Sequence, residues 1–357
     1  MIWPVLLCSA GLPIGFVLIR HVPLCPDRRA KETVALSVVI PARNEERNLP
    51  RLLASIAEST LSPAEMLVVD DASSDRTAAI ARDGGARVVQ SESLQPGWTG
   101  KAWACHQGAR LAQNSLLLFL DADTYLLPNG GERLRALFEE HCNPETAISV
   151  LPYHVMERPY EQLSLFFNLL MASGAGGFGV AGKPKLFGQS LMISQRLYAA
   201  TGGHAAVRGY ILENLKLSHL IHTAGFRTIC RGGCGTLHMR MYPDGFTQMC
   251  EGWTKAFADG AKDSGPVVTG AAILWISSLF TTFFLLVSPF NFGRASLALL
   301  YLIYSLQLFW MARQLGTYRW TTCFFYPAPL AFYSAIFARS LVRSVLGRRI
   351  LWRGREV

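Results

Sequence analysis

The sequence lacks the patterns that mark several common classes of protein. Its eight cysteines are scattered and none forms a C-x-x-C pair. Cys230, Cys234 and His238 do not have the spacing of zinc ligands, so a zinc centre is disfavoured and a reducing compartment fits the chain. The net charge is +9, but no array of basic and aromatic residues accompanies it, which argues against nucleic acid as a partner. The positive charge favours anionic lipid head groups or a phosphorylated ligand.

Charge is absent from four long apolar stretches, residues 2–19, 264–293, 295–312 and 320–338. Each is close to or above the roughly 18–20 residues that span a bilayer as a helix. No basic residue precedes the first stretch and no small-x-small cleavage site clearly follows it, which favours an uncleaved anchor over a secretory signal. We therefore expect an N-terminal transmembrane anchor at residues 1–22 and C-terminal membrane helices at residues 264–342.

Basic residues set the expected orientation in the membrane. Arg20, Arg28, Arg29 and Lys31 follow the first stretch, and six arginines lie in residues 339–357. By the positive-inside rule, residues 26–265 and the basic tail, residues 343–357, both face the cytoplasm of a multi-pass cell (inner) membrane protein. Four crossings would place the tail on the opposite side from that region. Residues 320–338 contain two prolines and are the candidate for a re-entrant or kinked segment.

The middle of the chain alternates between strand and helix patterns. "VALSVVIPARNEERNLPRLLASI" and "EMLVVDDASSDRTAAIARDGGARVV" each open with a β-branched apolar run and continue with helical spacing. This alternation predicts an α/β fold with a mainly parallel central sheet that is covered on both faces. Polar clusters follow three of the predicted strands, at residues 41–45, 70–75 and 121–123. Because ligands bind beyond the carboxyl ends of such strands, these clusters predict one site.

The motifs "VVIPARNEE", "MLVVDDASSDRT", "GKAWA" and "LFLDADT" together resemble an inverting family 2 glycosyltransferase. The resemblance implies a GT-A nucleotide-sugar-binding domain at residues 33–262, with a donor half at about 33–128 and an acceptor half at about 129–262. The later segments "LPYHVMERPYEQLSLFFN", "ATGGH" and "RMYPDGFTQMCEGWTK" resemble membrane enzymes of the diaponeurosporenoate glycosyltransferase type, which glycosylate carotenoid acids. Hopanoid-cluster glycosyltransferases are similar too.

The D-x-D pair Asp121 and Asp123 follows an apolar run, and two residues spaced by one point to the same side of an extended segment. A strand ending in a polar turn would also give this pattern. A nucleotide sugar carries an anionic diphosphate, which carboxylates hold only through a divalent cation such as Mg²⁺ or Mn²⁺. The resemblance implies that Asp123 coordinates this metal, while Asp121 reaches the ribose or the metal's water shell.

The resemblance also assigns residues to the nucleotide. It implies that Asp70 or Asp71 contacts the edge of the base, and that three residues shape the pocket beside the base and ribose: Pro41, Ala42 and Glu45. Lys101 would place a positive charge near the phosphates. A solvated lysine at the start of a helix would look the same in the sequence.

Acceptor activation usually needs a general base, which family 2 enzymes supply from an acidic pair. Here Glu213-Asn214 stands where Glu-Asp is common, so Glu213 is the expected catalytic base. A helix-start acid favoured by the helix dipole would also fit. His204 is expected on the acceptor side, or in packing.

The segment "GFTQMCEGWTK" is loosely similar to the Gln-x-x-Arg-Trp element of membrane family 2 enzymes. Gln248 precedes Trp253 by five residues rather than four, and Glu251-Gly252 replaces the arginine. Both residues are expected on the acceptor side, where Trp253 would stack on a sugar or an isoprenoid; an interfacial aromatic anchor is the alternative. Residues 163–182 are expected to form a helix at the membrane surface, or a buried core helix.

These features favour an inverting enzyme that moves a sugar, glucose by preference, from a UDP-sugar to an isoprenoid lipid such as a carotenoid carboxylic acid. The alternatives are a hopanoid, polyprenyl-phosphate or other lipid glycosyltransferase, and a non-catalytic nucleotide-sugar-binding scaffold. A carboxylic acid is already ionised at neutral pH and needs no base. Glu213 would then have to pair with a cation, such as Arg208 or Lys216, or lie a few ångströms aside, so as not to repel the acceptor.

Overall fold

A computed structural model describes residues 2–31, 34–141, 145–174, 177–179, 183–210, 212–263, 265–289, 293–345, 351–352 and 355–356. The chain folds into two compact units. The sheet unit comprises Pro23–His154 and Pro184–Met241, and the helical unit comprises Met1–Val22, Val155–Lys183 and Tyr242–Val357. Residues 155–183 and 242–262, which were expected in the glycosyltransferase domain, thus pack with the apolar helices.

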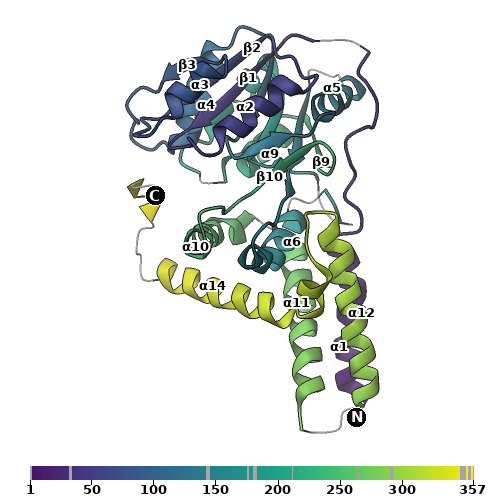
Figure 1. Cartoon of the computed structure of the whole chain (residues 1–357). Coiled ribbons are helices and arrows are strands. Elements are labelled where there is room, and N and C mark those ends of the chain that lie inside the picture. Colours follow the sequence, from purple (N-terminus) through teal and green to yellow (C-terminus); the bar gives the residue numbers. More distant parts are fainter. Residues whose placement is uncertain are drawn as a thin grey trace. The chain divides into compact units, whose positions relative to one another are not determined.

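The sheet unit is built on a seven-stranded sheet with the strand order β3-β2-β1-β4-β8-β6-β9. Figure 1 labels its strands β1, β2, β3 and β9. Its strands are β1 (Leu36–Ala42), β2 (Glu65–Asp70), β3 (Arg87–Gln90), β4 (Leu116–Leu120), β6 (Thr146–Leu151), β8 (Ser190–Ser194) and β9 (Arg227–Gly232). β8 runs antiparallel to both of its neighbours, and the other pairings are parallel. The α/β fold is therefore as expected, but the sheet is mixed because β8 is reversed.

Alternate residues of the central strands pack against helices on opposite faces of this sheet. On one face Val38, Ile40 and Leu118 lie in a core with α2 (Leu49–Glu58), α3 (Thr77–Asp83) and α5 (Gly130–Glu140). On the other face Val39 and Phe119 lie in a second core with α4 (Gly100–Leu111), α7 (Gln195–Ala200) and α9 (Glu213–Thr223). The short helix α8 (Gly203–Ala206) packs beside α4. Strands buried on both faces explain the continuous apolar runs in the sequence.

A three-stranded sheet completes this unit, with β10 (Leu237–Met239) between β5 (Thr124–Leu126) and β7 (Tyr153–His154). β5 begins directly after the D-x-D pair, and Ser55 on α2 accepts a hydrogen bond from the Leu126 amide at 3.0 Å. The segment that carries Asp121 and Asp123 is therefore fixed by a strand on each side.

The helical unit contains α1 (Ile2–Leu18), η1 (Pro159–Ser164), α6 (Leu165–Gly174), α10 (Phe246–Asp263), α11 (Pro266–Val287), α12 (Arg294–Arg313), α13 (Trp320–Phe324) and α14 (Pro327–Val345). Two short strands, β11 (Leu351–Trp352) and β12 (Arg355–Glu356), pair antiparallel in the basic tail. Within the described ranges, two helices are long and apolar enough to cross a membrane, α11 and α12. This supports membrane association only weakly, because a buried core helix has the same composition.

The other two apolar stretches behave differently. α1 is apolar but only 17 residues long, so the N-terminal transmembrane anchor stays a prediction. Residues 320–338 do not form one helix, because the chain breaks at Phe325 and Tyr326 between α13 and α14. The break directly precedes Pro327, whose ring cannot continue a preceding helix. The expected kink is present, and no single helix covers the fourth stretch.

The helix expected at the membrane surface is instead a buried one. In α6, seven of the ten residues are buried: Leu165, Phe166, Phe167, Asn168, Leu169, Ala172 and Ser173. Its small residues allow close packing inside the helical unit. Residues 175–176 and 180–182 of the expected helix lie outside the described residues.

Candidate active site

The loops after β1 and β2 are joined by hydrogen bonds at the carboxyl edge of the sheet. The Asn44 amide donates to Ser73 Oγ at 3.0 Å, and the Ser74 amide donates to Asn44 Oδ1 at 2.8 Å. Asn44 and Ala72 adopt left-handed backbone conformations, with φ of 54° and 53°. Such conformations cost energy in residues other than glycine and cluster at functional sites. These contacts give the edge of the sheet a defined shape.

The acids expected to contact the nucleotide are buried in this edge. Asp70 is 3% exposed, and its two carboxylate oxygens accept hydrogen bonds from the Ser73 amide at 3.0 Å and from Gln90 Nε2 at 3.1 Å. Asp71 is 6% exposed, and its backbone carbonyl accepts a bond of 2.6 Å from Arg43 Nη1. Asp70 thus orders the loop, and the structure gives it a structural role beside the expected recognition of the base.

The residues expected to shape the nucleotide pocket lie in the same network. Pro41 and Ala42 end β1 in register with the end of β2. Glu45 is buried, its amide donates to Thr77 Oγ1 at 2.8 Å, and its Oε2 accepts from Asn48 Nδ2 at 2.8 Å. Strand pairing therefore brings these residues next to Asp70 and Asp71, as expected from the carboxyl ends of neighbouring parallel strands.

Lys101 connects the donor and acceptor motifs. Its Nζ lies 2.8 Å from the Asp121 carboxylate and 3.2 Å from Glu213 Oε1, and it donates to the Gly188 carbonyl oxygen at 2.8 Å. A lysine ammonium has three donors, so these three partners use all of them. Lys101 is therefore held between two carboxylates and is not the solvated lysine of the alternative interpretation, while its expected place near the phosphates stays a prediction.

Local sequence explains the position of Lys101. Thr99 caps α4, since its side chain accepts a hydrogen bond from the Ala102 amide, and its own amide donates to the Arg208 carbonyl at 2.8 Å. Lys101 thus starts a helix, and its side chain is one-third exposed. Burial lowers the pKa of Lys101, but the charges of Asp121 and Glu213 outweigh it and raise the pKa above its ordinary value.

Glu213 lies at the first turn of α9 and is 4% exposed. Asn214 Nδ2 donates a bond of 3.3 Å to Glu213 Oε1. A Cβ atom added to Gly188 would lie 3.4 Å from Lys101 Nζ and 3.5 Å from Glu213 Oε1. The cluster therefore closes against bare backbone at Gly188, a residue that sequence reasoning missed because no motif marks it.

The D-x-D pair would offer two carboxylates to a divalent cation, and that of Asp121 is also ion-paired with Lys101. Asp121 and Asp123 are both partly exposed, and their oxygens are the hard ligands that Mg²⁺ and Mn²⁺ prefer. No group of three or more acidic, histidine or cysteine side chains suited to a metal occurs among the described residues. These two carboxylates therefore suit an ion whose remaining ligands are water or a bound diphosphate. They are too few to form a structural metal site.

His204 is fully buried against the sheet. Its ring packs edge-on against Phe119 at 5.0 Å, and its Nδ1 lies 2.9 Å from the Tyr198 hydroxyl. Burial, together with the charge of Lys101, lowers the pKa of His204 to about 3. A neutral, packed imidazole supports α8 behind the Lys101 cluster, which corresponds to the packing alternative for this residue.

Gln248 and Trp253 belong to the helical unit, whereas the other expected site residues belong to the sheet unit. Trp253 is 1% exposed: its ring stacks on Phe167 at 4.5 Å, and its Nε1 donates to Ser164 Oγ at 3.0 Å. Gln248 donates to Asp244 at 3.1 Å. Since a buried ring has no face to offer to an acceptor, the expected stacking role of Trp253 is not met, and neither is that of an interfacial anchor.

Comparisons with known proteins agree with the motifs at this edge. A family model described as glycosyl transferase family 2 matches residues 37–215. The 4,4'-diaponeurosporenoate glycosyltransferase of Staphylococcus haemolyticus (strain JCSC1435) is 36% identical over 264 residues, which cover 72% of this chain and 70% of that protein. Its counterpart of the same name in Staphylococcus aureus (strain USA300) is 31% identical over 331 residues, or 90% of this chain and 88% of that protein.

A solved structure shares the fold. The mannosyltransferase PcManGT from Pyrobaculum calidifontis, in complex with GDP-Man and Mn²⁺, aligns with a TM-score of 0.55 at 16% sequence identity, covering 97% of this chain and 95% of that one. This match shows that a glycosyltransferase of known structure shares the fold that carries the motifs at the edge formed by β1, β2 and β4. The chain belongs to glycosyl transferase family 2 and is a glycosyltransferase with a GT-A-like fold.

Proposed function

We propose that this enzyme transfers a sugar, glucose by preference, from a UDP-sugar to a carotenoid-type carboxylic acid, with inversion at the anomeric carbon. The product is a glycosyl ester of an isoprenoid lipid. Two relatives that match most of the chain carry the name 4,4'-diaponeurosporenoate glycosyltransferase, and this name supports the choice of acceptor class.

The ion pair between Lys101 and Glu213 is the observation that carries the proposal. An acceptor carboxylate can approach a second carboxylate only if a cation offsets the repulsion between them. Lys101 Nζ, 3.2 Å from Glu213 Oε1, supplies that cation. The partner is therefore Lys101 and not Arg208 or Lys216, which the sequence suggested. Glu213 then orients the acceptor and does not need to remove a proton from it.

The donor side rests on the D-x-D pair and on the loops after β1 and β2. Asp123, with Asp121, would hold a divalent ion such as Mg²⁺ or Mn²⁺. When bound, this ion offsets the charge of the leaving diphosphate. The loop fixed by Asp70 and Asn44 would receive the base and ribose. Lys101 holds Asp121 and Glu213 through one ammonium group and so keeps the donor and acceptor motifs in a fixed relation.

Membrane attachment fits an apolar acceptor. α11 and α12 would anchor the enzyme in the cell (inner) membrane as a multi-pass protein, with α1 as a further anchor and the sheet unit in the cytoplasm. A carotenoid acid dissolves in the bilayer, whereas a UDP-sugar is soluble in the cytoplasm. An anchored enzyme of this kind has access to both substrates.

A matched pair of acceptors tests this function. Membranes containing the full chain are incubated with labelled UDP-glucose and either a carotenoid carboxylic acid or the alcohol with the same carbon skeleton. We expect label in a lipid product from the acid alone, and mild alkali should release that label because the product is an ester. Label in the alcohol, stable to alkali, would instead identify a hydroxyl-directed lipid glycosyltransferase.

A further inference from the structure

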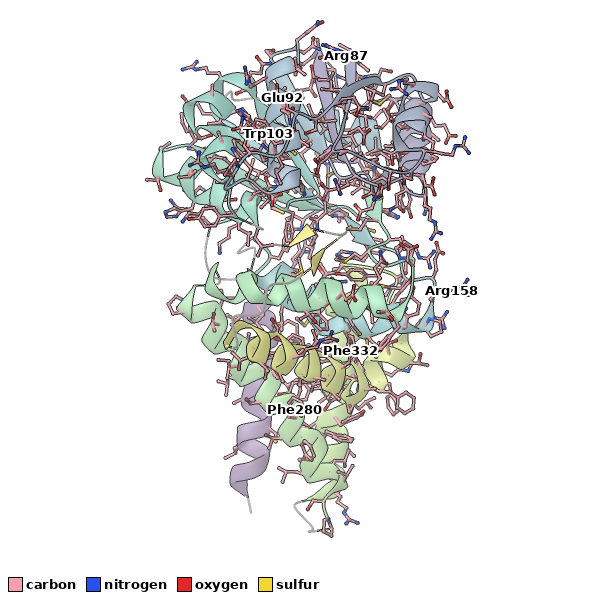
Figure 2. The ribbon with its side chains drawn as sticks, turned by 90° about the vertical axis from the view of Figure 1, so that its left-hand side faces the viewer. Arg87, Glu92, Trp103, Arg158, Phe280 and Phe332 are labelled. Atoms are coloured by element: carbon pink, nitrogen blue, oxygen red, sulfur yellow. The ribbon has the colours of Figure 1, made fainter. Side chains whose placement is uncertain are left out.

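α14 is oriented differently from the apolar helices of its own unit. α1, α11 and α12 lie side by side in a bundle, and α14 runs crosswise to that bundle (Figure 1). Figure 2, turned by 90°, gives the same relation, with Phe280 on the bundle helix α11 and Phe332 on α14. At about 1.5 Å per residue, α14 is long enough to span much of a bilayer. Length alone therefore does not decide how it meets the membrane.

The bundle has the close contacts of membrane helices. Gly11 and Gly15 of α1 are four residues apart, and a Cβ on either would collide with Tyr304 or Gln307 of α12. The Tyr304 hydroxyl donates to the Cys8 carbonyl at 2.5 Å, and Gln307 Nε2 donates to the Leu12 carbonyl at 2.7 Å. Small residues and neutral polar bridges are the usual contacts between helices in lipid. If this bundle crosses a membrane, its long axis is the crossing direction.

One face of α14 is packed against its own unit. Leu330, Ile336 and Ser340 are buried. The Ser340 hydroxyl donates to the Thr254 carbonyl of α10 at 3.0 Å, and Tyr333 packs on Phe167 of α6 with ring centroids 5.1 Å apart. This face holds α14 in its crosswise orientation.

The opposite face of α14 is apolar and exposed. Phe337 is 42% exposed, Leu341 55% and Val342 56%, and four exposed alanines share this face along the helix: Ala328, Ala331, Ala335 and Ala338. Such a continuous apolar surface is uncommon on a helix that faces water. Arg339 is exposed at one edge of this surface, and five more arginines follow in the sequence. Apolar surface edged by arginine matches the boundary between acyl chains and anionic head groups.

We propose that α14 lies in the plane of the membrane, with its exposed face in the head-group boundary of an anionic bilayer, and does not cross it. The proposal is independent of the sugar and of the acceptor. If α11 and α12 each cross once, then residues 19–265 and the arginine-rich tail lie on the same side. This removes the conflict between four crossings and the positive-inside rule.

Depth measurements on the full chain test the proposal. Ala331 and Val342 are eleven residues apart on the exposed face, about 16 Å along the helix axis. Ala331→Cys and Val342→Cys are each labelled with a fluorophore in anionic vesicles, with the wild-type chain as the blank for native cysteines. Lipids carrying a quencher near the head group or deep in the chains are then added. Ile336→Cys, on the packed face, is the matched control and should resist labelling.

We expect the shallow quencher to act equally on both exposed positions. A helix that crosses the bilayer would place them at depths differing by about half of the roughly 30 Å core, and would overturn the proposal. Absence of quenching at both positions would show that this face meets water, and would overturn it as well. In sealed vesicles, an impermeant maleimide should label Asp83→Cys and Val357→Cys from the same side; labelling from opposite sides would contradict the proposal.

Discussion

The two units bury polar side chains for different purposes. In the sheet unit, Lys101 sits between the carboxylates of Asp121 and Glu213, at a place where the lysine is still one-third exposed. In the helical unit, neutral groups such as Trp253 and Gln307 form hydrogen bonds between tightly packed helices. The charged cluster can respond to a ligand, whereas the neutral bridges only hold helices together.

This difference separates chemistry from packing. A buried ion pair that opens to solvent changes its energy when a charged substrate arrives. A tryptophan whose ring is covered and whose N–H is already bonded gains nothing from a substrate. We therefore place the reaction in the sheet unit and give Trp253 a structural role. The following changes test that division, beginning with the largest expected effect.

Replacement of Asp123 by asparagine should abolish transfer. The change removes a charged oxygen ligand for a divalent ion and preserves the shape of the side chain. Transfer is measured with labelled UDP-glucose in membranes, and Asp83→Asn, at the exposed end of α3, is the control. Chelator should inactivate the wild type, and Mn²⁺ or Mg²⁺ should restore it. Full activity in excess chelator would show that transfer does not need a divalent metal.

Replacement of Lys101 by methionine should lower kcat by about 10²–10³-fold, the usual cost of losing one preorganised electrostatic contact. Asp121 and Glu213 would lose their shared cation and repel each other. Lys216→Met, on the same helix as Glu213, is the matched control and should change kcat little. Equal effects of the two substitutions would show that Lys101 acts only through net charge.

The sheet unit could be predicted from sequence further than the helical unit. Asp70 ends a strand, and Asp121 and Asp123 follow one directly. Their proximity could be predicted because the carboxyl ends of parallel strands meet at one edge of the sheet. The reversal of β8 could not be predicted, because residues 190–194 form an apolar run that fits either direction. The contact of Lys101 with Glu213 was also hidden, since 112 positions of chain separate them.

The helical unit was harder to predict because periodicity does not distinguish a buried helix from one that faces lipid. α6 and α14 are both apolar, yet the first is buried and the second exposes Phe337 and Leu341. Trp253 lies in a segment similar to an acceptor element, but Ser164 and Phe167 bury it. Only tertiary packing determines which polar or aromatic residue on such helices stays free.

Replacement of Trp253 by phenylalanine should lower the thermal midpoint in detergent by about 2–4 °C, since one buried hydrogen bond of about 1 kcal/mol is lost. The KM for the acceptor should not change. Trp320→Phe is the control, because Trp320 is 37% exposed. A rise in acceptor KM without loss of stability would place Trp253 at the acceptor and break the division between the units.

Replacement of Glu213 by glutamine, measured with a carotenoid carboxylic acid as acceptor, tests the central claim most directly. Glutamine keeps an oxygen that can accept a hydrogen bond from Lys101, and it removes the capacity to take up a proton. If the acceptor is already ionised, kcat should fall by less than about fivefold, far short of the ~10²–10⁴-fold that a general base contributes. A fall of more than about a thousandfold, in a folded protein that still binds UDP, would contradict the account and make Glu213 an ordinary catalytic base.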